Sequence, residues 1–142
     1  MNPPGVYAVR KRGPHKACGL YAHITWHTWR RQQSIRRTDV AEIAAAILQA
    51  GQCRGVRVHG QAVLTDHVHV IVSYNPAVAL APFVRHAKSE SARRVNLLRD
   101  ALGTTLRWCR GYYAGSLSST HVTAARVYVA RQHARHPDRI PQ

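Results

Sequence analysis

The sequence has few acidic residues, and this scarcity limits the chemistry that it can perform. Only 6 of its 142 residues are Asp or Glu, against 21 Lys and Arg. The acids are scattered along the chain: Asp39, Glu42, Asp66, Glu90, Asp100 and Asp138. A nuclease that holds two metal ions with clustered carboxylates is therefore hard to build from this sequence.

Cysteines and long apolar runs are scarce as well. Cys18, Cys53 and Cys109 are odd in number and widely spaced, which excludes a disulfide framework and a Cys-x-x-Cys zinc ribbon. The longest apolar segment, Ile43 to Leu48, is too short to span a bilayer, and the N-terminus has no apolar signal-peptide core. We therefore expect a cytoplasmic protein with no membrane partner.

Positive charge and histidine are abundant by contrast. The net charge is +15 and the pI is near 11.2, which points to a polyanionic partner, nucleic acid first. Solubility or genome composition is the alternative explanation for the arginines. The ten histidines suit borderline divalent metals, so any metal chemistry should use histidine.

The length suits one domain, residues 1–142, with a basic mobile arm at 1–18 and a frayed basic tail at 134–142. Between them, alternating apolar residues predict strands at 20–28, 55–64, 63–72 and 106–117. Helical spacing predicts helices at 39–50, 81–98 and 122–133, the first closed by Gly51. This β-α-β-β-α-β-α order predicts an α+β fold, a ferredoxin-like antiparallel sheet with helices on one face and the other face open.

A pair of histidines lies within the third predicted strand. Alternation places His67 and His69 on one face while Val68 and Val70 point into the core. Ten histidines predict about 0.7 such pairs by chance, so the pair gains meaning only from its place on the open face. Asp66 should point away from His67, as a residue of the turn or a support to the histidine.

The last predicted helix carries Tyr128 and Gln132, four residues apart and so on one helical face. A tyrosine, with an ordinary pKa of about 10, can attack a phosphate that a metal ion polarises. In the alternative interpretation, Tyr128 is an amphipathic edge residue and Gln132 faces solvent.

Basic and aromatic residues supply candidate contacts to nucleic acid. The candidates are Arg30, Arg31, Arg85, Arg93 and Arg94 for the phosphates, and Trp29 for base stacking. Trp29 is favoured over Trp26, which shares a strand face with Ile24. A solvated basic surface is the alternative for the arginines.

Taken together, these motifs resemble the HUH single-tyrosine transposases of small insertion sequences and the related REP-associated tyrosine transposases. The resemblance covers about residues 19–133. It rests on Asp66-His67-Val68-His69, the basic helix, Gly111-Tyr112-Tyr113 and Tyr128-x-x-x-Gln132. Thr65 departs from the family pattern, because proline often stands at this position.

The resemblance implies that His67, His69 and Gln132 hold one Mg²⁺ or Mn²⁺ ion and that Tyr128 attacks single-stranded DNA. The expected products are a 3′-OH and a 5′-phosphotyrosine link, which a later attack rejoins. The resemblance also implies a DNA substrate with hairpins and a second copy of the chain as a homodimer partner. Residues 115–120 would be the hinge that lets the helix carrying Tyr128, the tyrosine helix, complete the histidine site of either subunit.

Two other functions fit parts of the pattern. One is a domesticated relative that binds hairpin or single-stranded nucleic acid without cutting it. The other is an RNA phosphoesterase with two His-x-Thr or His-x-Ser motifs, but the His-x-His pair occurs once. For the general base, His133 and a metal-bound water remain alternatives.

Overall fold

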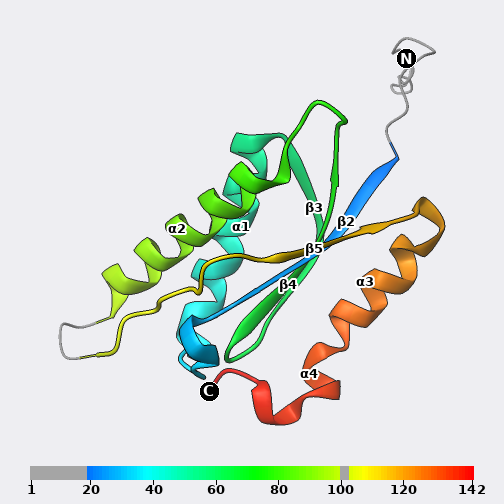
Figure 1. The fold of residues 1–142 in the computed structure, drawn as a ribbon. Helices are drawn as coiled ribbons and strands as arrows, with labels where there is room; N and C mark the ends of the chain where they lie inside the picture. Colours follow the sequence, from blue (N-terminus) through cyan, green and yellow to red (C-terminus); the bar gives the residue numbers. More distant parts are fainter. Residues whose placement is uncertain (1–18, 100–102) are drawn as a thin grey trace, which may run out of the picture.

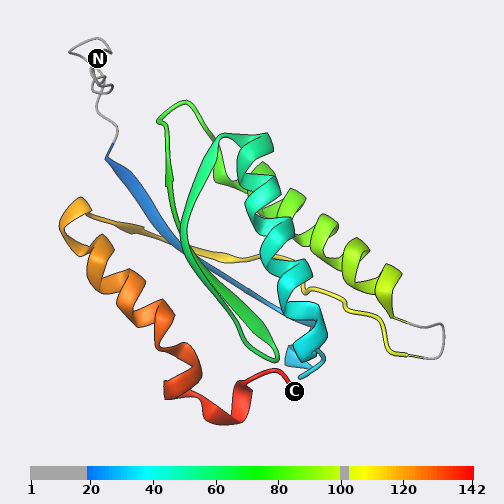
Figure 2. The same cartoon turned by 180° about the vertical axis from the view of Figure 1, so that it is seen from behind.

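A four-stranded antiparallel sheet separates two layers of helices in the computed structural model, which describes residues 19–99 and 103–142 (Figures 1 and 2). The strands are β2 (Leu20–His27), β3 (Val56–Val63), β4 (His67–Tyr74) and β5 (Tyr113–Leu117), in the order β3-β4-β2-β5. The longer helices are α1 (Val40–Arg54), α2 (Leu80–Leu98) and α3 (Val122–Ala130). The predicted α+β, ferredoxin-like fold is confirmed, while the arm predicted at 1–18 lies outside the described residues.

The sheet's two faces follow from alternation along β2 and β4. Ala22, Ile24 and Trp26 are buried on the face that α1 and α2 cover. β4 pairs antiparallel with β2, and Ile24 lies opposite Val70. Residues of intermediate exposure alternate with the buried ones in β2 and point to the other face.

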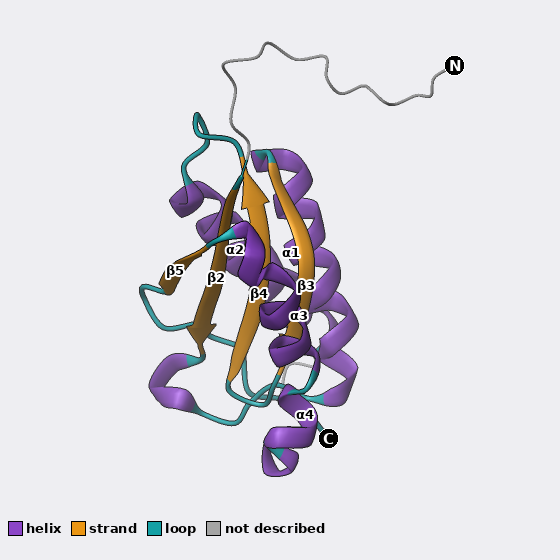
Figure 3. Cartoon of the chain, turned by 90° about the vertical axis from the view of Figure 1, so that its right-hand side faces the viewer, coloured by secondary structure: helices purple, strands orange, loops and turns teal. Residues whose placement is uncertain are grey.

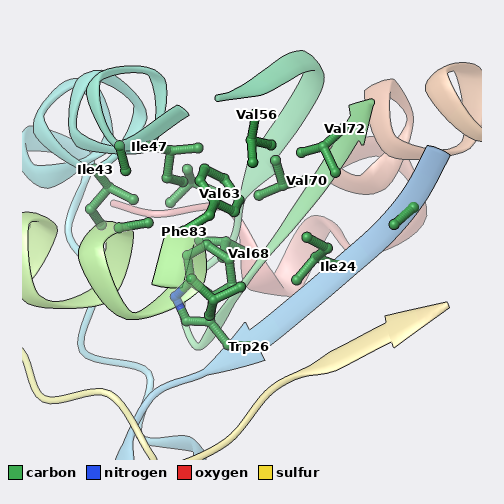
Figure 4. Packing of buried hydrophobic residues seen from close by; sticks show 14 of the residues in the cluster. Ile24, Trp26, Ile43, Ile47, Val56, Val63, Val68, Val70, Val72 and Phe83 are labelled. Atoms are coloured by element: carbon green, nitrogen blue, oxygen red, sulfur yellow. The ribbon is translucent and has the colours of Figure 1, made fainter. Parts of the chain in front are cut away.

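The hydrophobic core lies between the sheet and the α1–α2 layer. Ile43 and Ile47 of α1 and Phe83 of α2 pack against the valines of β4 (Figure 4). Burying a large apolar side chain contributes about 1.5–3 kcal/mol relative to leaving it exposed. This layer therefore holds the sheet rigid, and α3 lies across the face that the sequence pattern left open (Figure 3).

The first helix is longer than predicted, because Gly51 does not close it. α1 continues to Arg54, and Gly55 ends it in the left-handed conformation at φ 70°. Gly51 lies buried inside the helix, where a Cβ atom would come within 2.5 Å of the carbonyl oxygen of Val56. It is needed for close packing against the start of β3 rather than for a turn.

The strand predicted over 106–117 forms only at its end, Tyr113–Leu117. Leu106 is buried instead, and both of its backbone groups bond to the side chain of Asn96 on α2. Gly111, at φ 88°, interrupts the extended chain before β5 begins.

The chain end also departs from the prediction. The helix expected over 122–133 breaks at Arg131, and α4 (Gln132–Arg135) and the 3₁₀ helix η4 (Pro137–Arg139) follow. The tail predicted to be frayed is bonded to the body: the carbonyls of Arg139 and Gln142 accept hydrogen bonds from the amides of Thr65 and Arg37, both at 2.9 Å.

Across the described residues, no helix has the length and apolar character needed to cross a bilayer.

Candidate active site

Two histidines of β4 meet under α3, on the face opposite the core. His67 and His69 point the same way, as the alternation predicted, and their Nε2 atoms lie 3.1 Å apart. Val68, between them, is fully buried on the other side. The strand thus supplies a packed core and a polar face from adjacent residues.

Asp66 turns back toward His67, although a neighbouring residue in a regular strand would point away. It lies in the turn before β4, is 1% exposed, and its Oδ1 atom accepts a hydrogen bond from Nδ1 of His67 at 2.7 Å. A proton on Nδ1 leaves the Nε2 lone pair of His67 free to bind a cation.

His69 is held by His23, which the sequence analysis did not assign to the site. Nδ1 of His69 lies 2.9 Å from Nε2 of His23 on the neighbouring strand. Burial, followed by the nearby His67 and His23, lowers the pKa of His69 to about 4. His69 is therefore neutral at pH 7, with a lone pair available. The alternation of β2 puts His23 on the open face. The register places Thr25 directly opposite His69, so His23 reaches His69 diagonally across the two strands.

Tyr128 and Gln132 lie over the histidines, from α3 and α4. The Tyr128 ring centroid is 6.0 Å from those of His23 and His69, and the residue is 40% exposed. Gln132 is buried and donates to the carbonyl of Tyr128 at 3.2 Å. Its side chain lies beside His69 and acts to raise the pKa of that histidine. The two residues thus meet at one place although the helix breaks between them.

The donor set fits one divalent cation. Two nitrogens bound to one ion at about 2.1 Å and at a right angle lie about 3 Å apart, close to the separation of the two Nε2 atoms. Within the described part of the chain, no group of three His, Cys, Asp or Glu side chains forms a metal site. The candidate ligands are therefore the imidazoles of His67 and His69 and the side-chain amide of Gln132. Three protein ligands leave coordination positions on a divalent cation for phosphate oxygens.

The predicted DNA contacts divide between the two sides of the sheet. Arg93 and Arg94 lie on α2, in the helical layer beyond the core, and both bond to Glu90, at 2.6 and 2.8 Å. The hydrogen bond from Arg93, then that from Arg94, lowers the pKa of Glu90 to about 2. Arg85 is exposed on the same helix.

The loop after β2 brings the other candidates toward the histidines. Arg30 and Arg31 have φ values of 54° and 52°, a left-handed conformation that costs non-glycine residues free energy. Nη1 of Arg31 lies 4.0 Å from Asp66. The guanidinium of Arg107 already stacks on the Trp29 ring, with its Cζ atom 4.0 Å from the ring centroid. A base can stack on that face only by displacing Arg107.

His133, one alternative for the general base, lies against the backbone of β3. Its Nε2 atom is 2.8 Å from the carbonyl oxygen of Val63, which makes this nitrogen a donor. Only Nδ1 of His133 is then left to accept a proton.

The sequence comparison identifies the chain as a transposase. Residues 16–132 match the family model described as "Transposase IS200 like", and the chain belongs to this family. A curated relative, the ISDra2 transposase TnpA of Deinococcus radiodurans, is 30% identical over 129 residues, which cover 87% of this chain and 91% of that protein.

Solved structures share the fold. A crystal structure of a Deinococcus radiodurans R1 protein described as a transposase superposes with a TM-score of 0.64 at 22% identity, covering 87% of this chain and 98% of that one. A REP-associated tyrosine transposase bound to a REP hairpin superposes with a TM-score of 0.67 at 14% identity, covering 89% of this chain and 73% of that one.

Proposed function

We propose that this transposase cuts and rejoins single-stranded DNA through a covalent bond between Tyr128 and a 5′-phosphate. The observation that carries the proposal is the convergence of Tyr128 and Gln132, from the end of the chain, on His67 and His69. A phenol beside a cation site is the arrangement that nucleophilic attack on a phosphodiester needs.

His67, His69 and Gln132 would hold one Mg²⁺ or Mn²⁺ ion. When bound, such an ion supplies positive charge that polarises the scissile phosphate and neutralises charge in the transition state. Asp66 and His23 keep the two imidazoles turned toward each other, through bonds of 2.7 and 2.9 Å. The neutral state of His69 suits this role, because a protonated imidazole cannot bind a cation.

Tyr128 would act as the nucleophile. Its partial exposure allows DNA to reach the hydroxyl, while its position over His69 keeps that hydroxyl beside the cation site. The Tyr128 oxygen bonds to phosphorus, the bond from phosphorus to the 3′-oxygen breaks, the phenol loses its proton, and the departing oxygen takes one up. The adduct conserves the phosphodiester energy, so another 3′-OH can reverse the step without ATP.

The substrate would be single-stranded DNA with hairpins, as the REP-associated relative is bound to a hairpin. Arg30, Arg31 and Arg85 are the proposed phosphate contacts with Arg93 and Arg94, and Trp29 is the proposed stacking residue. In this structure Tyr128 lies over the histidines of its own chain, and we propose a homodimer in the cytoplasm in which the tyrosine helix can serve either subunit.

The test is a covalent adduct on a denaturing gel. The full chain is incubated with Mn²⁺ and a 5′-labelled or 3′-labelled single strand from the ends of its element. Tyr128→Phe should abolish the adduct, whereas Tyr113→Phe, a control at a more exposed tyrosine on β5, should retain it. An adduct that persists in Tyr128→Phe refutes the nucleophile, and EDTA-resistant hairpin binding without any cleavage favours the domesticated, non-cleaving alternative.

A further inference from the structure

Asp66 has two partners, and the second comes from the end of the chain. Its Oδ1 atom bonds to Nδ1 of His67 at 2.7 Å, and its Oδ2 atom accepts a hydrogen bond from Nη1 of Arg139 at 2.6 Å. The carboxylate is 1% exposed, so water does not compete for these bonds. An unbroken series of bonded groups therefore runs from Arg139 through Asp66 to His67.

Arg139 is fixed by its backbone as well as by its side chain. Its amide donates to the carbonyl of His136, and its carbonyl accepts from the amide of Thr65, both at 2.9 Å. Thr65 directly precedes Asp66, so the terminal segment is bonded to the turn that sets up the histidine strand. Pro141, beyond it, is buried.

We propose, on the basis of the proposed function, that Arg139 is a positioning residue that orients His67 for metal binding by holding Asp66. A buried carboxylate is costly unless it is paired, and an arginine on one oxygen leaves the other free to accept from the histidine. Arg31 is a poor substitute, because its guanidinium is 4.0 Å from the same oxygen and more than half exposed.

The position of Arg139 also ties metal binding to the docking of the chain end. Gln132, the third proposed ligand, and Arg139 lie seven residues apart on one segment that follows Tyr128. If that segment leaves the sheet, the site loses the ligand Gln132 and, with Arg139, the group that holds Asp66 against the ligand His67. Metal affinity should therefore report whether the tyrosine helix is seated.

The first test measures Mn²⁺ binding to the full chain without DNA, by calorimetry. Arg139→Gln should weaken Mn²⁺ affinity about 10- to 100-fold, the range seen when groups that support metal ligands are removed. Arg139→Lys should restore part of the affinity, and Arg57→Gln, an exposed arginine on β3, should change nothing. Wild-type affinity in Arg139→Gln overturns the inference.

A double-mutant cycle separates positioning from general damage. Asp66→Asn keeps the side chain's shape but removes its charge, and it should weaken Mn²⁺ binding by itself. If Arg139 acts through Asp66, the variant that combines Asp66→Asn with Arg139→Gln should bind Mn²⁺ no more weakly than the single variant with the lower affinity. Fully additive losses overturn the inference. If Arg139→Gln does not fold, Arg139→Lys takes its place in the cycle.

Nitrogen NMR of His67 supplies a readout that unfolding does not imitate. The wild-type imidazole should be protonated on Nδ1, and Arg139→Gln should show a mixture of tautomers in a folded protein. An unchanged His67 tautomer contradicts the inference. His67→Ala separates the two proposals. If His67→Ala keeps the wild-type Mn²⁺ affinity, the proposed metal site is wrong. If His67→Ala loses Mn²⁺ affinity while Arg139→Gln keeps it, only the proposed role of Arg139 is wrong.

Discussion

The two faces of the sheet are built from the same strands and differ in nearly every physical respect. Toward α1 and α2, β4 presents Val68, Val70 and Val72, all fully buried among apolar side chains. Toward α3 it presents His67 and His69, whose Nε2 atoms lie 3.1 Å apart and which are hydrogen-bonded to Asp66 and to His23 of β2. One face is held by apolar packing, whereas the other combines apolar packing at Ile71 and Val129 with directed polar contacts.

The apolar face mainly stabilises the fold, whereas the polar face holds the groups of the candidate site. Apolar packing is nondirectional and tolerates volume-conserving exchanges. Hydrogen-bonded imidazoles fix atom positions, yet burying a titratable group costs free energy that the apolar face must offset. The rigid α1–α2 layer thus allows the opposite face to carry the buried His69 and the partly buried His67 beneath a short helix that bears the exposed Tyr128.

The largest expected effect lies on the polar face. His67→Ala should reduce DNA cleavage at least about a thousandfold, or about 4 kcal/mol of transition-state stabilisation, because one of three proposed ligands is lost. Its unfolding free energy should change by about 1 kcal/mol or less, since His67 is partly exposed and Asp66 keeps Arg139. Single-turnover cleavage and urea unfolding measure the two quantities, and retained cleavage contradicts the metal assignment.

The apolar face should show the reverse pattern. Phe83→Ala removes a fully buried ring and should lower the unfolding free energy by about 3–5 kcal/mol. Protein that remains folded should still bind Mn²⁺ with nearly the wild-type affinity. Leu97→Ala, on the same helix but 71% exposed, is the matched control and should stay within about 0.5 kcal/mol. A small loss in Phe83→Ala means that α2 is not part of the main core.

The apolar face could be read from the sequence almost completely. Periodicities of two and about 3.6 residues placed β2, β4 and α2 within a few positions, because burial on one side imposes those periods. The α+β order followed from them. The elements that failed, the start of the fourth strand and the end of the last helix, are held by side chains such as Asn96 and by backbone breaks at Gly111 and Arg131.

The polar face was predicted only in part. Alternation placed His67 and His69 together, and helical spacing placed Tyr128 near Gln132. The contacts of His23 and Arg139 could not be foreseen, because they depend on strand register and on where the chain end docks. Such contacts join residues 46 and 73 positions apart, and no local period records them.

Acid should destabilise the protein through its polar face. The pKa of His69 falls from 6.5 in the unfolded chain to about 4 in the fold, so the unfolded state binds more protons between these values. Stability should be complete above pH 6.5 and decline by up to about 3 kcal/mol as the pH falls to 4. Urea unfolding at several pH values measures the slope. His69→Asn should flatten it, and an unchanged slope shows that His69 is not the source.

The smallest expected effect concerns two glycines on the apolar side, Gly51, which allows close packing against β3, and Gly55, which adopts a positive φ. Gly51→Ala should lower the unfolding free energy by about 1–2 kcal/mol, because the new Cβ meets the Val56 carbonyl oxygen while Ala gains helix propensity. Gly55→Asn should be nearly neutral, since asparagine accepts the left-handed conformation.

Gly51→Asn supplies the decisive comparison between these two positions. It keeps the steric conflict without the propensity gain of alanine, so it should be worse than Gly51→Ala and far worse than Gly55→Asn in urea unfolding. Neither glycine lies on the α3 face, so Mn²⁺ affinity should stay constant in all folded variants. Equal tolerance of asparagine at both positions would mean that α1 does not press on β3 at Gly51, and the rigid support of the polar face would need another source.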